Sequence, residues 1–223
     1  MTRHSSVRMR AVLFDFDGTL ADTAPDLGGA LNRMRIVRSL APLALGALRP
    51  FTSAGARGLL QAGFGVTPEH PEYAGMRDEF LSYYGEQSCE HTALFAEIPE
   101  LLEAIEARGL PWGIVTNKPE RFTRPIVAAL GFEGRSACVI GGDTTAHAKP
   151  HPAPLLEAAR LIRLPPQACW YVGDDLRDVQ AARAAGMRSV AVEYGYLGTE
   201  NGGPREWSAD LVIASPLELL AYL

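Results

Sequence analysis

The amino-acid sequence predicts an α/β protein in which a doubly wound parallel sheet carries helices on both faces and a separate helical segment follows the first strand. Two patterns support this prediction. Short apolar runs alternate with helical patterns from residue 108 to the end of the chain, and a long, mostly helical stretch separates the first run from the second. With 223 residues, the chain is long enough to bury a core without support from disulfides or metals.

Six apolar runs are expected to form the strands of the sheet. The first four end at polar or glycine residues, and the last two are weaker. Helical patterns lie between them, with proline near their start or glycine at their end. The predicted strands are residues 11–14, 112–115, 137–140, 169–172, 189–192 and 211–213, and the predicted helices are residues 99–109, 125–131, 153–162 and 176–185. Pro125 is tolerable only near the first turn of its helix, because proline lacks a backbone N–H.

Residues 24–90 interrupt the alternation of strands and helices. They contain helix-forming stretches at 26–39 and 73–86, a glycine-rich patch at 54–58, and few strand-like runs. A connection of this length is too long for a loop and is expected to be a small helical domain. The predicted organisation is therefore an α/β core made of residues 1–23 and 91–223, with residues 24–90 inserted as a helical domain.

Composition and charge exclude several classes of partner. The chain has 21 Lys and Arg residues against 26 Asp and Glu residues, a net charge of −5, which argues against bulk binding of nucleic acid. No apolar run is long enough to cross a membrane, and the polar N-terminal residues do not resemble a secretion signal. Three cysteines without metal-ligand spacing favour a reducing cytoplasm. Nothing in the sequence predicts an oligomeric state.

Polar side chains follow four of the predicted strands. In open parallel sheets, ligands bind at the carboxyl ends of the strands, so these side chains are expected to meet. They are Asp15, Asp17, Gly18 and Thr19 after the first strand, Thr116, Asn117 and Lys118 after the second, Lys149 after the third, and Asp174, Asp175 and Asp178 after the fourth.

This set of residue types suits phosphate chemistry. Carboxylates that converge on one point repel each other unless a hard cation joins them, and Mg²⁺ prefers oxygen ligands while keeping waters that a phosphate can share. Lys149, Thr116 and Asn117 offer positive charge and hydrogen-bond donors to a phosphate. Asp15 and Asp17 follow the same strand, so one can attack while the other exchanges protons. Gly18 would let the backbone turn closely and expose amides.

Each motif alone has an ordinary structural explanation. The Asp15–Thr19 run could be a turn after a strand, one of the residues Asp174 and Asp175 could cap a helix, and a lone lysine such as Lys149 is usually solvated. These explanations do not account for four complementary sets, each after a predicted strand.

Four motifs together resemble the haloacid dehalogenase superfamily. They are DFDGTLADT at Asp15–Thr23, VTNK at Val115–Lys118, AKPHP at Ala148–Pro152 and VGDDLRD at Val172–Asp178. The chain is most similar to phosphoglycolate phosphatase-like members, which carry a helical cap domain after the first strand. The resemblance covers nearly the whole chain from Arg10 and implies that residues 24–90 are such a cap.

The resemblance also implies roles for individual residues. Asp15 would be the nucleophile that forms an aspartyl-phosphate, and Asp17 would protonate the leaving oxygen and then activate water. Thr116 and Lys149 would hold the phosphate. Mg²⁺ would be bound by the Asp15 carboxylate, the Asp17 backbone carbonyl and Asp174, with Asp178 at or near the metal.

The expected function is therefore magnesium-dependent hydrolysis of a phosphomonoester, a small acidic phosphate such as phosphoglycolate. The dehalogenases of the superfamily lack the second carboxylate, so Asp17 argues against that activity. The stretches HTALF, YGYL and WSADLVI also resemble a subgroup that acts on N-acetylmuramic acid 6-phosphate, although Ala96-Glu97 departs from the pair that its members usually have.

The sequence leaves two alternative functions open and suggests one residue for contact with the substrate. A phosphosugar mutase of the same superfamily would keep every core motif. A phospho-accepting receiver module would place its aspartate on a middle strand and would lack a large helical insert. On the cap, Arg57 is the residue expected to reach the site, where a guanidinium could bind a substrate carboxylate.

Overall fold

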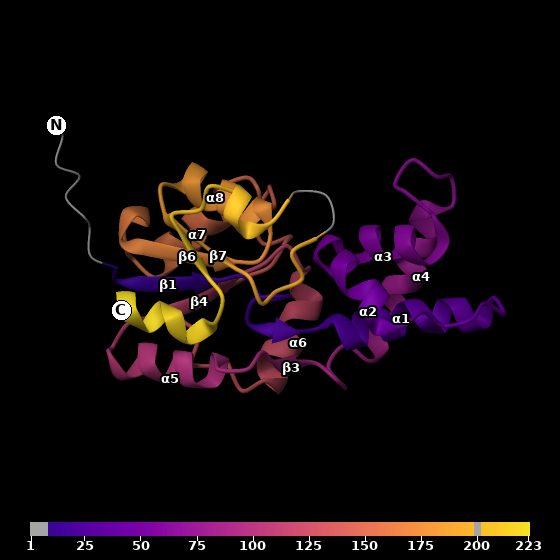
Figure 1. The fold of residues 1–223 in the computed structure, drawn as a ribbon, viewed down its shortest axis with the longest axis horizontal. Coiled ribbons are helices and arrows are strands. Elements are labelled where there is room, and N and C mark those ends of the chain that lie inside the picture. The colour runs from indigo at the N-terminus through magenta and orange to yellow at the C-terminus, as the bar shows by residue number, and fades with distance from the viewer. Residues whose placement is uncertain (1–8, 199–201) are drawn as a thin grey trace.

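A computed structural model describes residues 9–198 and 202–223 and divides them into a sheet-centred body and a helical body that lie side by side (Figure 1). The sheet has six strands in the order β5-β4-β1-β6-β7-β8, and every neighbouring pair is parallel. The strands are β1 (Ala11–Phe14), β4 (Trp112–Val115), β5 (Val139–Ile140), β6 (Cys169–Gly173), β7 (Arg188–Val192) and β8 (Leu211–Ile213). The predicted fold class is confirmed.

Strand β1 lies at the centre of the sheet and shows why both of its faces are covered. All four of its residues are fully buried, which is typical of a parallel strand between two helical layers. Alternate side chains point to opposite faces: Ala11 and Leu13 join one apolar cluster, while Val12 and Phe14 join the other. Because a strand buried on both faces is apolar throughout, the run of four apolar residues was enough to predict β1.

Helices follow the strands in the order expected of a doubly wound sheet. They are α5 (Ile98–Ala107), α6 (Glu120–Ala129), α7 (Ala153–Leu161) and α8 (Leu176–Ala185), with short 3-10 turns η2 (Pro166–Ala168), η3 (Pro204–Glu206) and η4 (Pro216–Tyr222). Helices α7 and α8 cover one face of the sheet, and α5 lies on the other (Figure 1). Helix α8 has the range predicted from the sequence.

Helix α6 begins earlier than predicted. It starts at Glu120, which places Pro125 inside the helix rather than in its first turn. The missing N–H of Pro125 leaves the carbonyl of Arg121 without its intrahelical donor. Both residues are exposed, so water can bond to that carbonyl. The rule that proline starts a helix therefore gave a start five residues too late.

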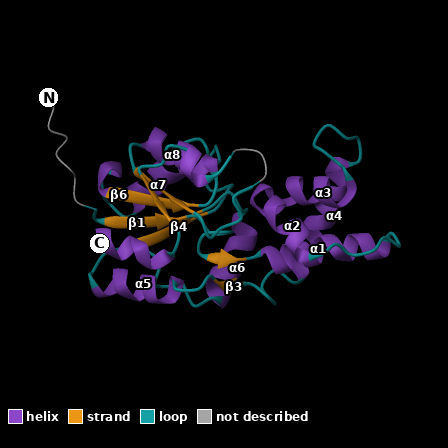
Figure 2. Cartoon of the chain, viewed as in Figure 1, coloured by secondary structure: helices purple, strands orange, loops and turns teal. Residues whose placement is uncertain are grey.

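The inserted segment forms the helical body. Its elements are α1 (Ala24–Val37), α2 (Leu45–Leu48), the 3-10 helix η1 (Arg49–Ala54), α3 (Gly55–Phe64) and α4 (Tyr73–Glu86). Helix α1 packs against both α3 and α4, and no strand lies among these helices (Figure 2). No helix in residues 9–198 and 202–223 combines the length and the apolar character needed to span a membrane.

Two short segments connect the bodies and were not predicted. Strands β2 (Ala21–Asp22) and β3 (Ala93–Leu94) form an antiparallel pair of only two residues each, too short to give a sequence pattern. The buried carboxylate of Asp26 accepts hydrogen bonds from the backbone N–H groups of His91 and Thr92. The two connections between the bodies are therefore held next to each other where the helical body begins and ends.

Candidate active site

A cavity of about 300 Å³ lies where the carboxyl ends of the central strands meet the helical body. Segments that follow strands β1, β4, β5 and β6 contribute seven of the residues named from the sequence, and helix α3 contributes the eighth. These residues are Asp15, Asp17, Thr116, Asn117, Lys149, Asp174 and Asp178, together with Arg57. Of the predicted site residues, Gly18 is the one that does not line the cavity.

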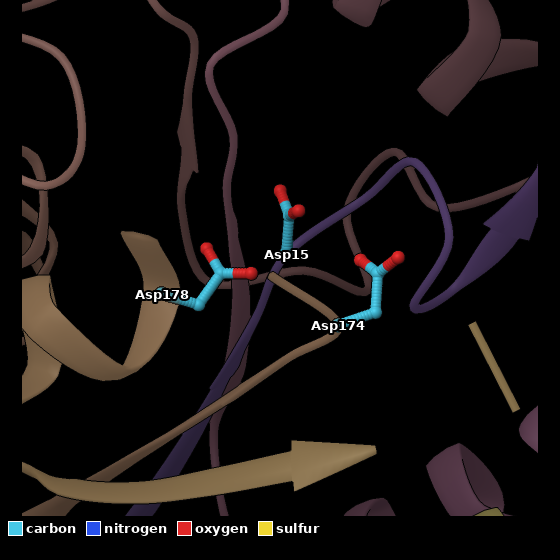
Figure 3. A group of neighbouring side chains, drawn as sticks. All are labelled: Asp15, Asp174 and Asp178. Carbon is cyan, nitrogen blue, oxygen red and sulfur yellow. The ribbon is translucent and has the colours of Figure 1, made fainter. Parts of the chain in front are cut away.

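Three buried carboxylates converge at the base of the cavity (Figure 3). Asp15 follows β1, Asp174 follows β6, and Asp178 lies in the first turn of α8. One oxygen of each lies within 4.8 Å of the others. Because these three residues follow two adjacent strands, the parallel pairing of β1 with β6 is what brings them together.

The electrostatics of this cluster favour a bound cation. Burial, and then the neighbouring carboxylate of Asp15, raise the pKa of Asp174 well above its usual range. Burial raises the pKa of Asp178 to about 7, although Lys149 opposes the shift. Asp15 Oδ1 lies 2.8 Å from Lys149 Nζ, and the same ammonium also pairs with Asp178. Three acidic side chains with too little positive charge around them fit a hard divalent cation with oxygen ligands.

Close packing explains two glycines beside this cluster. A Cβ on Gly18 would lie 2.2 Å from Asp174 Oδ2, and a Cβ on Gly173 would lie 2.2 Å from Asp178 Oδ2. The N–H of Gly18 itself is not available to a phosphate, because it donates to the carbonyl of Ala21 at 3.0 Å. Gly18 instead makes room for Asp174.

Lys149 supplies the positive charge nearest to the three carboxylates. Its ammonium lies 2.8 Å from Asp15 Oδ1 and 2.7 Å from Asp178 Oδ1, and it donates to the hydroxyl of Tyr171 at 2.7 Å. The side chain is almost fully buried. A lysine held this firmly between two carboxylates is placed to neutralise charge that arrives next to Asp15.

Asn117 holds the backbone of Lys149 in this structure, and its predicted contact with phosphate stays a prediction. Its side-chain Nδ2 donates to the carbonyl of Lys149, and its Oδ1 accepts from the Lys149 N–H, both at 2.9 Å. The amide group is therefore used to fix the Lys149 backbone. Thr116, in contrast, is buried at the cavity wall, and its hydroxyl oxygen accepts from the Lys118 N–H at 3.1 Å, which leaves the hydroxyl hydrogen free to bond to a ligand.

Asp17 is paired with Lys118, a strand-end residue for which the sequence predicted no role in the site. Its Oδ1 accepts from Lys118 Nζ at 2.9 Å and from the hydroxyl of Thr23 at 2.5 Å. Lys118 stands in the same VTNK run as Thr116, so its position at a strand end was the available signal. The two carboxylates that follow β1 thus have different cationic neighbours, Lys149 for Asp15 and Lys118 for Asp17.

Asp175 belongs to the framework of the site. It caps helix α8 by accepting from the Arg177 N–H, while Asp178 accepts from the Asp175 N–H in a capping box. The Arg177 guanidinium pairs with Asp175 and also donates to the carbonyl of Ser53 in η1 at 2.7 Å. This contact joins the start of α8 to the helical body.

The helical body gives the cavity a cationic and aromatic wall. Arg57 in α3 and Arg77 in α4 both line it, and Arg77 was not predicted. Within the described part of the chain, the Arg57 side chain makes no hydrogen bond or ion pair, and the one ion pair of Arg77 is a 3.7 Å contact with the exposed Asp78. Tyr73 and Leu81, which are partly buried, add apolar surface beside them, and the rings of Phe80 and Tyr84 pack behind the wall.

Comparisons with known proteins agree with this geometry. The model of the family described as haloacid dehalogenase-like hydrolase matches residues 12–192. The chain is 42% identical over 217 residues to an N-acetylmuramic acid 6-phosphate phosphatase of Pseudomonas aeruginosa, covering 97% of this chain and 96% of that one. It is 46% identical over 209 residues to a phosphoglycolate phosphatase of Xylella fastidiosa, covering 93% and 90%.

A solved structure extends the likeness to three dimensions. The crystal structure of a predicted phosphoglycolate phosphatase from Haemophilus somnus superposes with a TM-score of 0.82 at 28% identity, covering 96% of this chain and 97% of that one. The family model, the relatives and the fold all confirm the resemblance seen in the four motifs. The chain belongs to the haloacid dehalogenase-like hydrolases.

Proposed function

We propose that this hydrolase is a magnesium-dependent phosphatase that cleaves a phosphomonoester through an aspartyl-phosphate on Asp15. The observation that carries the proposal is the placement of Asp15 at the base of the cavity, between Lys149 and two further buried carboxylates. A carboxylate becomes an effective nucleophile toward phosphorus when the charge of the phosphate is neutralised by groups already in place.

Each residue of the site has a part in this reaction. Asp15 attacks phosphorus, Lys149 neutralises charge on the phosphoryl oxygens, and the Thr116 hydroxyl donates a hydrogen bond to one of them. Asp17 gives a proton to the leaving oxygen and takes one from the water that hydrolyses the aspartyl-phosphate. Asn117 acts indirectly, because it holds the backbone of Lys149.

Mg²⁺ is the cation proposed for the acidic cluster. Asp15, Asp174 and Asp178 would hold it, together with the backbone carbonyl of Asp17. When bound, the ion supplies Lewis-acid charge stabilisation at the phosphate. The raised pKa values of Asp174 and Asp178 support a cation at this point, because both carboxyl groups are buried close to Asp15.

The substrate is proposed to carry a carboxylate as well as the phosphate. Arg57 and Arg77 face the cavity without a strong internal partner, and a guanidinium binds carboxylate well. A volume of about 300 Å³ and the apolar wall with Tyr73 and Leu81 favour a ring-sized leaving group over a two-carbon acid. N-acetylmuramic acid 6-phosphate, in the name of the Pseudomonas aeruginosa relative, meets both conditions; 2-phosphoglycolate meets only the first.

Residues 24–90 are proposed to act as the cap of this enzyme, with residues 1–23 and 91–223 as its core. The cavity walls come from both parts, so the substrate would be enclosed only with the helical body in place. The cytoplasmic location expected from the cysteine content stays a prediction.

The nucleophile assignment predicts the effect of one substitution. Asp15→Asn should lower kcat for phosphate release by at least about a thousandfold, because an amide cannot form the aspartyl-phosphate. Asp143→Asn, on an exposed carboxylate outside the cavity, is the matched control and should keep wild-type activity. EDTA should stop the wild-type enzyme, and added Mg²⁺ should restore it. Activity of Asp15→Asn near the wild-type level would refute the assignment.

The close approach of Gly173 to Asp178 predicts a weaker metal site in Gly173→Ala. The added Cβ would displace the Asp178 carboxylate, so the affinity for Mg²⁺ measured by isothermal titration calorimetry should fall by about tenfold or more. Gly75→Ala is the control, because a Cβ at Gly75 meets open space in helix α4. Equal affinities of the two variants would show that Asp178 does not contribute to the site.

Substrate recognition is tested by comparing kcat/KM for two acidic phosphates. N-acetylmuramic acid 6-phosphate should exceed 2-phosphoglycolate, and Arg57→Ala should raise KM for the preferred acid by about tenfold while changing KM for p-nitrophenyl phosphate far less. Arg108→Ala, on an exposed residue after helix α5, controls for loss of positive charge. A preference for 2-phosphoglycolate would overturn the proposal of a ring-sized leaving group, and an equal effect of Arg57→Ala on both kinds of substrate would remove Arg57 from recognition.

A further inference from the structure

The two lysines of this protein occupy unusual positions. Among the 21 basic residues of the sequence, Lys118 and Lys149 are the only lysines, and every other one is an arginine. Both lysine side chains are almost fully buried in the site. Lysine differs from arginine in presenting a compact point charge. The only two compact cationic charges of this kind in the chain therefore both lie in the site.

The contacts of Lys118 direct its ammonium toward Asp17, with Tyr84 as its second neighbour. Its N–H donates to the Thr116 hydroxyl, and its carbonyl accepts from the Gly142 N–H and from the Thr123 hydroxyl, so the backbone is held at both groups. The side chain then reaches Asp17 Oδ1 at 2.9 Å, with a side-chain exposure of 5% for the lysine and 17% for the aspartate. The ion pair is therefore largely removed from water.

The two carboxylate oxygens of Asp17 have different surroundings. Oδ1 accepts from both Lys118 and the Thr23 hydroxyl. Within residues 9–198 and 202–223, Oδ2 has no hydrogen-bond donor. Asp17 lines the cavity, so its carboxylate meets the substrate with one oxygen held and the other free.

We propose that Lys118 is the positioning residue of Asp17: by holding Oδ1 it makes Oδ2 the oxygen that exchanges protons with the substrate. The inference deepens the proposed function and rests on it. In the first step, the bond from Asp15 to phosphorus forms, the bond to the leaving oxygen breaks, and the proton on Asp17 Oδ2 moves to that oxygen. In the second step, water forms a bond to phosphorus, the Asp15–phosphorus bond breaks, and the water proton returns to Oδ2.

Tyr84 extends this arrangement to the helical body. Its ring, from helix α4, lies with its centroid 4.6 Å from Lys118 Nζ, and the Phe122 ring packs against Tyr84 with a centroid separation of 5.4 Å. A cation over an aromatic face is stabilised, and more so away from water. Lys118 is thus held between Asp17 of the core and Tyr84 of the proposed cap, so its position depends on both bodies.

The test compares phosphate esters whose leaving groups differ in their need for a proton. For Lys118→Met, which keeps the length of the side chain without its charge, kcat/KM should fall about a hundredfold on alkyl phosphates and less than about fivefold on p-nitrophenyl phosphate. Lys118→Arg, which restores a cation, should recover part of the loss on alkyl phosphates. A purely structural role would lower both rates equally, and that result would overturn the inference.

A spectroscopic measurement tests the contacts separately from turnover. In an NMR spectrum of the full-length protein with ¹³C-labelled lysine, each of the two lysines gives one Cε signal. The signal that disappears in Lys118→Arg belongs to Lys118, and the remaining signal belongs to Lys149. The Lys118 signal should shift in Asp17→Asn and in Tyr84→Leu, and it should shift less in Tyr84→Phe, which keeps the ring but loses the hydroxyl beside Lys118.

The possible failures are distinct. A Lys118 signal unchanged in Asp17→Asn would overturn the positioning role even if the wild-type enzyme is an active phosphatase. A wild-type enzyme that releases no phosphate from any ester would instead overturn the proposed function, and the inference about Lys118 with it.

Discussion

The buried ammonium of Lys149 is the interaction on which the rest of the site depends. It lies within 2.8 Å of both Asp15 and Asp178, carboxylates that come from different elements of the core. Removing one partner from a buried ion pair is strongly destabilising, because the remaining charge has no water to solvate it. Two features keep the Lys149 ammonium between these two carboxylates. Asn117 binds the backbone of Lys149, and the capping of helix α8 fixes Asp178.

Asp178 also has two structural roles, one for each of its carboxylate oxygens. One of its oxygens accepts from Lys149, while the other accepts from the Asp175 N–H and so closes the first turn of α8. The residue thus connects the stability of a helix to the geometry of the acidic cluster. On the side of the core, hydrogen bonds and ion pairs join the site residues directly to one another. The walls contributed by α3 and α4 are joined to the core through two short segments and through side-chain contacts such as that of Arg177 with Ser53.

Much of this arrangement could be predicted from the sequence, and the limits have physical causes. The β1 strand shows as an apolar run, and the rule for strand ends correctly grouped Asp15, Asp174 and Asp178. Strands β2 and β3 were invisible because two residues make no pattern, and the start of α6 was misplaced because exposure of Pro125 relieves its usual cost. The roles of Gly18 and Asn117 depend on partners distant in the chain, which spacing alone does not reveal.

The scarcity of lysine has a practical consequence for measuring motion. Reagents that modify primary amines require access to a side chain, and both lysines lie within the cavity walls, covered and ion-paired. Modification of either lysine must therefore wait for the site to open. The rate of lysine modification, measured by mass spectrometry on the unaltered protein, therefore reports how often the site opens.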